Sequence, residues 1–138
     1  MVTNSQPNPP GFAWTEILKR PTQEAFAAAF AKNIIIDTSI ATRSIVGPVD
    51  LRSFFDASRT MYDAINFTHE TRSGSRTCLE WQGKFQGNDI AGTTILAFDD
   101  NGAIESIQLY HRPYAQVIAY SAELGRRLKG KIDPSIFA

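Results

Sequence analysis

The sequence has no excess charge of either sign and only one cysteine. Lysine and arginine together number 14, as do aspartate and glutamate, so the formal net charge is zero. Nucleic acids and anionic membranes usually bind proteins through a basic surface, and we therefore expect neither partner. Because Cys78 has no second cysteine to pair with, an internal disulfide framework is excluded, and we expect a buried structural thiol.

Long apolar runs and a signal-peptide pattern are missing as well. No apolar stretch approaches the ~20 residues of a transmembrane helix, and the first residues lack a charged segment followed by an apolar one. We therefore predict a cytoplasmic protein. A length of 138 residues predicts one domain with a substantial core.

The first part of the chain predicts an arm followed by helices. Residues 1–11 contain three prolines and little that could be buried, so they predict a disordered or extended arm. A short helix around Trp14 follows. Thr22 is the expected N-cap of a second, alanine-rich helix that carries Phe30 and ends near Asn33.

The middle of the chain alternates between strand and helix patterns. A β-branched run predicts a strand that ends at Asp37, whose carboxylate we expect to point inward. Residues 40–46 predict a second short extended piece. Apolar residues at helical spacing after Asp50 predict a helix that includes Tyr62, and residues 65–71 predict a strand.

The chain from 76 to 113 predicts three antiparallel strands with an Asn-Gly turn before the last of them. If this turn pairs Phe98 with Ala103, then Thr94 faces Ile107. Alternate residues of each strand share a face of the sheet. The predicted inner face contains Leu79, Trp81, Phe85, Thr94, Leu96, Ile107, Leu109 and His111.

An amphipathic pattern after Pro113 predicts a last helix over residues 113–129. Helices first, then a long antiparallel run, indicate an α+β fold with helices on one face of a strongly curved sheet. We expect one domain over residues 12–130 that includes this C-terminal helix.

The segments FAAAFAKNIIIDTS and FDDNGAIESIQLYHRP, in this order, resemble the nuclear-transport-factor-two-like superfamily. Within it, the chain is most similar to the SnoaL-like polyketide cyclases and the ketosteroid isomerases, over roughly residues 12–113. The resemblance implies a cystatin-like cone, in which a curved mixed or antiparallel sheet wraps around N-terminal helices and encloses a mostly apolar cavity. It also implies a homodimer formed through the outer sheet face. The C-terminal helix would either cap the cone mouth or extend the dimer contact.

The same resemblance disfavours steroid isomerisation. Thr94 stands where the isomerases have a neutral hydrogen-bond-donating aspartic acid, and Trp14 stands where they have the oxyanion tyrosine. Asp37 or Thr38 stands near their general base. Without the two oxyanion donors, the electrostatic stabilisation that makes enolisation fast would be absent.

A different set of residues is similar to the dehydratase members of the superfamily. Asp37 and His111 are candidate acid and base residues, with His69 on a neighbouring strand and Tyr62 beside them. Histidine exchanges protons readily near neutral pH, and a carboxylate partner would fix its tautomer. Equally, His111 could be a rim residue bonded to the backbone, and Asp37 could cap a strand end.

The facing of His69 depends on the length of the turn before residue 76. A two-residue loop pairs His69 with Cys78 on the outer face, whereas a three-residue loop with a bulge pairs it with Leu79 inside. The histidines and Asp37 lie on separate elements without metal-ligand spacing, so we predict no metal and no cofactor.

Three functions fit these patterns. The first is binding of a small apolar or aromatic molecule, with His111 as polar partner. The second is a cofactor-independent dehydratase, isomerase or cyclase, and the third is a structural dimerisation module whose cavity is filled by side chains. Sequence alone does not separate the first two, because a fold does not determine a function. The candidate ligand-binding residues are Trp14, Phe30, Tyr62, Trp81, Thr94, Leu96 and Leu109.

Overall fold

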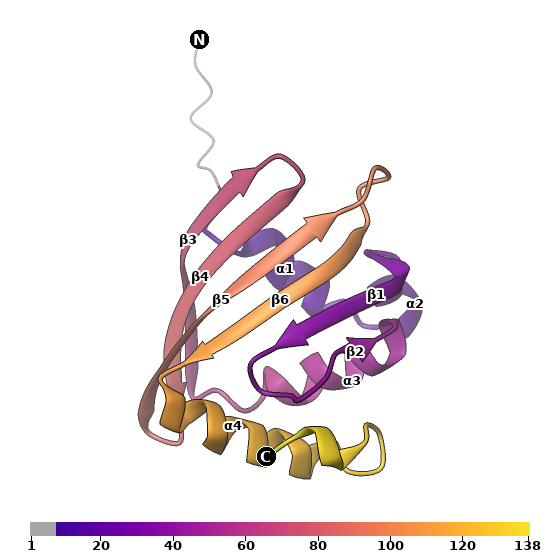
Figure 1. Ribbon diagram of the computed structural model, residues 1–138. Helices are drawn as coiled ribbons and strands as arrows, with labels where there is room; N and C mark the ends of the chain where they lie inside the picture. The colour runs from indigo at the N-terminus through magenta and orange to yellow at the C-terminus, as the bar shows by residue number, and fades with distance from the viewer. Residues whose placement is uncertain (1–7) are drawn as a thin grey trace.

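A curved six-stranded sheet is the main feature of the computed structural model, which describes residues 8–138 (Figure 1). The strand order is β2-β1-β6-β5-β4-β3, in which β1 and β6 are parallel and all other neighbours are antiparallel. The strands are β1 (Phe30–Thr38), β2 (Ile45–Val46), β3 (Ala64–Ser73), β4 (Arg76–Phe85), β5 (Asn88–Phe98) and β6 (Ile104–Arg112). The predicted α+β class with a curved mixed sheet is confirmed.

The helices cover one side and one end of this sheet. They are α1 (Phe12–Leu18), α2 (Gln23–Ala27), α3 (Pro48–Ser58), α4 (Tyr114–Arg127) and the short 3₁₀ helix η1 (Pro134–Ile136). In Figure 1, α1 lies behind the sheet and α4 crosses its lower end, where β6 finishes. None of the helices in residues 8–138 is long and apolar enough to cross a membrane.

The N-terminal helices agree with the sequence patterns except at their ends. Thr22 caps α2, since its Oγ1 accepts a hydrogen bond from the backbone N–H of Ala25 at 3.0 Å. The prediction that this helix continues to Asn33 is wrong, because Phe30 already pairs with Ile104 in the sheet. Here burial of a strand outweighs the helix propensity of the alanines.

The predicted N-terminal arm extends too far along the chain. Residues 1–7 lie outside the described residues, but Gly11 is buried, and its backbone N–H donates to Oε1 of Glu70 on β3 at 2.9 Å. A side chain at Gly11 would overlap the Phe67 ring, with the added Cβ only 2.5 Å from it. The end of this segment is therefore fixed against β3.

Helix α3 is displaced toward the N-terminus relative to its prediction. It begins at Pro48 and ends at Ser58, so Tyr62 lies in the connection to β3 and not on a helix. The reason is local, because the backbone N–H of Asp63 already bonds to the carbonyl of Lys84 on β4 at 2.9 Å. Sheet pairing thus begins directly after Tyr62.

The predicted register of β5 and β6 is wrong by two residues, but the predicted faces are right. Thr94 pairs with Leu109 and not with Ile107. The ladder is irregular near the hairpin, where Oδ1 of Asp99 accepts hydrogen bonds from two backbone N–H groups of the loop. An even offset preserves the two faces of a strand. All eight residues of the predicted inner face are buried.

Helix α4 packs on the sheet through only part of its apolar residues. Tyr120 and Leu124 are completely buried, whereas Tyr114 and Ile118 are 80% and 46% exposed. The Tyr120 ring lies 5.0 Å from Phe85 of β4 and 4.8 Å from His111 of β6, measured between ring centroids. Helix α4 therefore covers one end of the sheet, and its predicted part in a dimer contact stays a prediction.

Candidate functional site

A cavity of about 420 Å³ lies between α1, the end of α3 and the inner face of the sheet. We call it the aromatic cavity. Its apolar walls are Trp14, Leu18, Phe55, Tyr62, Ile65, Phe67, Trp81 and Leu109, and its polar lining is Thr15, Lys19, Ser58, Arg59, Thr60 and Thr94. Two residues of the edge strand β3, Ile65 and Phe67, belong to this wall. Phe67 is paired with Trp81 of β4, and Ile65 is paired with Gly83, so both lie on the same face as Trp81.

Trp14 forms the partition between the aromatic cavity and a second one. Its ring packs edge-on against Phe55 at 5.3 Å and Phe30 at 6.2 Å, which fixes its orientation. The second cavity, also about 420 Å³, is lined by Trp14, Leu96 and charged side chains of β3 and of the loop after β5. A wider hollow of about 610 Å³ lies on the outer face, around Gln82 and Arg112.

A glycine allows Trp81 to reach into the aromatic cavity. Gly92 is paired with Trp81 on one side and with His111 on the other. A Cβ at Gly92 would lie 2.2 Å from the indole ring, so only glycine leaves room for it. The indole N–H of Trp81 donates to Oγ1 of Thr94 at 3.2 Å, and its ring contacts His111 edge-on at 5.1 Å.

His111 is a buried, neutral residue next to the aromatic cavity. Its Nε2 lies 2.9 Å from the hydroxyl of Tyr62, and its backbone N–H donates to Ser39 Oγ at 2.8 Å. Among the described residues, Nδ1 has no hydrogen-bond partner. Burial lowers the pKa of His111 to about 3 and raises the pKa of Tyr62 well above 10. His111 is therefore not the rim residue that the sequence left open, because it is buried and the Tyr120 ring of α4 packs against it.

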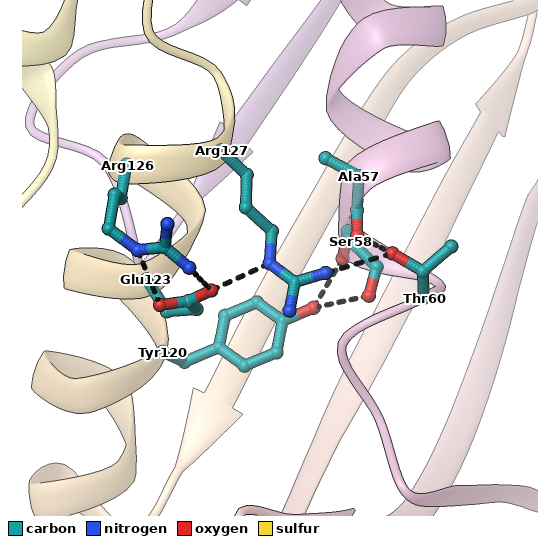
Figure 2. A network of polar contacts seen from close by, with 7 residues as sticks. All are labelled: Ala57, Ser58, Thr60, Tyr120, Glu123, Arg126 and Arg127. Atoms are coloured by element: carbon teal, nitrogen blue, oxygen red, sulfur yellow. Dashed lines mark hydrogen bonds and ion pairs between the residues drawn. The ribbon is translucent and has the colours of Figure 1, made fainter.

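A polar network holds α4 against the end of α3 (Figure 2). The Tyr120 hydroxyl lies 2.5 Å from Ser58 Oγ and donates to the Ser58 carbonyl at 3.0 Å. Burial raises the pKa of Tyr120 to about 12, so this phenol stays protonated. Nearby, Arg127 donates to Oγ1 of Thr60 at 3.2 Å and to Glu123 at 2.7 Å. Since Ser58 and Thr60 both line the aromatic cavity, α4 supports one of its walls.

The structure does not bring the three predicted acid–base residues together. Asp37 is exposed on the outer face, in register with Gln108, and its carboxylate accepts a hydrogen bond from Ser44 Oγ. The prediction that it points inward is wrong, because the alternating residues Ile34 and Ile36 occupy the inner face.

His69 also lies outside the cavity. It is paired with Glu80, with an irregularity in β3 just before it, so neither of the two predicted pairings occurs. Its side chain is 71% exposed, and Nδ1 lies 4.0 Å from a Glu80 carboxylate oxygen. Among residues 8–138, no group of three histidine, cysteine, aspartate or glutamate side chains could hold a metal ion.

Most of the predicted ligand-binding residues do line the aromatic cavity. Trp14, Tyr62, Trp81, Thr94 and Leu109 are part of its wall. The other two are displaced from it, since Phe30 packs behind Trp14 and Leu96 lines the second cavity.

Several wall residues were missed by the sequence analysis. Phe67 could have been found from its alternation with Ile65 on the predicted strand. Tyr120, which supports the wall through Ser58, could have been found from its helical spacing to Leu124. No sequence signal showed that Arg59 and Lys19 line the cavity, because both follow the ends of helices that meet only in the folded chain.

Comparisons with known proteins show the fold. No family model matches the sequence, and neither does any curated protein. The chain superposes on a steroid delta-isomerase from Pseudomonas aeruginosa with a TM-score of 0.76 and 19% identity, over 86% of this chain and 88% of that one. An uncharacterized bacterial protein with a cystatin-like fold, from Silicibacter pomeroyi, superposes with a TM-score of 0.75 and 16% identity, over 84% of this chain and 82% of that one. The chain has the cystatin-like cone fold.

A third structure belongs to the SnoaL-like branch. A SnoaL-like family protein from Agrobacterium tumefaciens matches this cystatin-like chain with a TM-score of 0.54 and 16% identity, over 72% of this chain and 92% of that one. The fold that the sequence resemblance implied is thereby confirmed. At such identities the likeness carries no activity from one protein to another.

Proposed function

We propose that this cystatin-like chain binds a small apolar or aromatic molecule in the aromatic cavity. The observation that carries the proposal is the cavity itself, about 420 Å³ in volume and lined by aromatic rings from α1, α3, β3 and β4. Binding sites for small molecules usually measure ~300–1,000 Å³ and combine an apolar lining with a few polar groups. Burial of the ligand's apolar surface would supply most of the binding free energy.

Three polar groups of the wall support this assignment, because each is already hydrogen-bonded within the chain. Thr94 accepts from the Trp81 indole, Ser58 bonds to Tyr120, and the Tyr62 hydroxyl bonds to His111. A ligand without strong polar groups in its buried part would leave these pairs intact. The alternative of a purely structural module has less support, since side chains do not fill the interior.

The acid–base alternative has less support than binding. A general base works best with a pKa near the working pH, but the pKa of buried His111 is about 3 and that of Tyr62 is raised well above 10. Asp37 and His69, the other candidate groups, are exposed on the outer face. The Tyr62–His111 pair is better suited to shaping the cavity wall than to moving protons.

Tryptophan fluorescence tests the proposal, because both tryptophans of the chain line the aromatic cavity. Titration with neutral phenylbutyramide should change the emission in a saturable way. Ile65→Tyr adds volume at the cavity wall and should weaken binding at least fivefold. Ile118→Tyr is the matched control, because Ile118 is comparably exposed but lies on α4, outside the cavity. A titration without saturation, or equal effects of the two variants, would contradict the proposal.

A further inference from the structure

The charged side chains of the aromatic cavity are of one sign. Lys19 and Arg59 line it, each just past the end of a helix, and no carboxylate does. The second cavity, on the other side of Trp14, differs, since Glu70 and Asp99 line it together with Arg72. A wall with cations alone is therefore a property of the aromatic cavity and not of the whole cone interior.

These cations are only partly neutralised by their surroundings. Lys19 Nζ lies 3.8 Å from Oε2 of Glu16, and both side chains are exposed. Within residues 8–138, no carboxylate oxygen lies within 4.0 Å of the Arg59 guanidinium. At least one cation at the cavity thus has no anionic partner from the described chain.

The adjoining network adds further positive charge on the same side. Figure 2 shows Glu123 shared by Arg126 and Arg127, so two guanidinium groups face one carboxylate. Arg127 also reaches Thr60, which is part of the cavity wall. An anion bound beside Arg59 would therefore also lie near the surplus positive charge of α4.

We propose that the ligand of the aromatic cavity carries a carboxylate, or an anionic group of similar size, which pairs with Arg59 and Lys19 while its apolar body lies against Trp14 and Trp81. The proposal rests on the function proposed above and names the chemical class of the ligand. A guanidinium binds a carboxylate through two parallel hydrogen bonds, which also orients the ligand. Aromatic walls alone would equally suit a methylated ammonium group through cation–π contacts, but the two cations repel such a ligand.

Three probes that share the same phenylpropyl body separate these possibilities: phenylbutyrate, neutral phenylbutyramide and phenylpropyl-trimethylammonium. We expect phenylbutyrate to bind about tenfold more tightly than the amide, as two partly exposed ion pairs would give, and the ammonium compound to bind most weakly. Added salt should reduce the advantage of the carboxylate, because exposed ion pairs are screened.

Substitution of the cations completes the test. In Arg59→Gln/Lys19→Gln, phenylbutyrate should lose its advantage and bind only as tightly as the amide binds to the same variant. Lys129→Gln, an exposed lysine outside this cavity, is the control and should keep the tenfold difference. Equal affinity of carboxylate and amide, or preference for the ammonium compound, would overturn the inference alone. Failure of all three probes to bind would overturn the proposed function as well.

Discussion

The hydroxyl of Tyr62 and Nε2 of His111 lie 2.9 Å apart, beneath the end of the sheet that α4 covers. This hydrogen bond links the cavity wall to a histidine that burial keeps neutral. Because Nδ1 of the same ring has no partner among the described residues, protonation would place an uncompensated charge in the core. The stability of the chain should therefore depend on pH through this residue.

The first prediction concerns that dependence. The pKa of His111 is lowered from 6.5 to about 3 by burial. Between these two values the unfolded chain binds a proton that the folded chain does not, so the stabilisation is complete above about pH 6.5 and declines as the pH falls. The slope is about 1.4 kcal/mol per pH unit. Denaturant unfolding at about pH 7 and about pH 5 should reveal this loss.

Two histidine variants provide the comparison for this measurement. His111→Gln should remove the decline between pH 7 and pH 5, whereas His69→Gln, at the exposed second histidine, should keep it. Glu123 does not titrate between pH 7 and pH 5. Its pKa is lowered from 4.5 to about 2 by Arg126 and Arg127, so its stabilisation is lost only below about pH 4.5. An unchanged slope in His111→Gln would contradict the assignment.

The second prediction concerns the attachment of α4. Tyr120→Phe removes the hydroxyl that bonds to Ser58 and leaves the buried serine without that partner, which should lower the free energy of unfolding by about 1–3 kcal/mol. Tyr114→Phe is the matched control on the same helix, since Tyr114 is largely exposed. If both variants unfold at the same denaturant concentration, the Tyr120–Ser58 contact does not hold the helix.

The third prediction concerns Gly92. Its replacement by alanine places a methyl group against the Trp81 ring and should destabilise the chain by about 1–3 kcal/mol. Adding Trp81→Phe should relieve only the part of this cost that comes from the indole ring, because the added Cβ would also lie 2.4 Å from the backbone carbonyl oxygen of Tyr110. A double-mutant cycle from thermal or denaturant unfolding measures the coupling. Strictly additive losses would show that the two residues do not compete for space.

The fold was largely predictable because its determinants are local. Alternation along the C-terminal strands defined the inner face, and an error of two residues in register left every facing unchanged. The acid–base site was not predictable, because its determinants are not local. The facing of Asp37 and of His69 depends on where pairing begins and on an irregularity in β3, which periodicity does not reveal.

The position of Tyr62 shows a further limit. Helical spacing extended the predicted helix through this residue, but pairing of Asp63 with Lys84 starts the sheet immediately after it. Likewise, the alanines before Phe30 favour a helix, while the pairing of Phe30 with Ile104 requires a strand. In both places a long-range contact outweighed a local preference.

The fourth prediction is the homodimer, which the resemblance implied and which stays a prediction. Its expected contact is the outer sheet face, where Tyr110 is 42% exposed and Cys78 is half-buried. Light scattering should give twice the chain mass, and Tyr110→Lys should shift the equilibrium toward the monomer, since it places a charge in the contact. A monomeric mass for the unaltered chain would remove the prediction.

A crystal structure of the chain soaked with phenylbutyramide tests the central claim most directly. The account predicts electron density for the phenyl ring within the aromatic cavity, in contact with Trp14 and Trp81. Density only in the outer-face hollow around Gln82 and Arg112, or in neither place at a ligand concentration that saturates the fluorescence change, would contradict it.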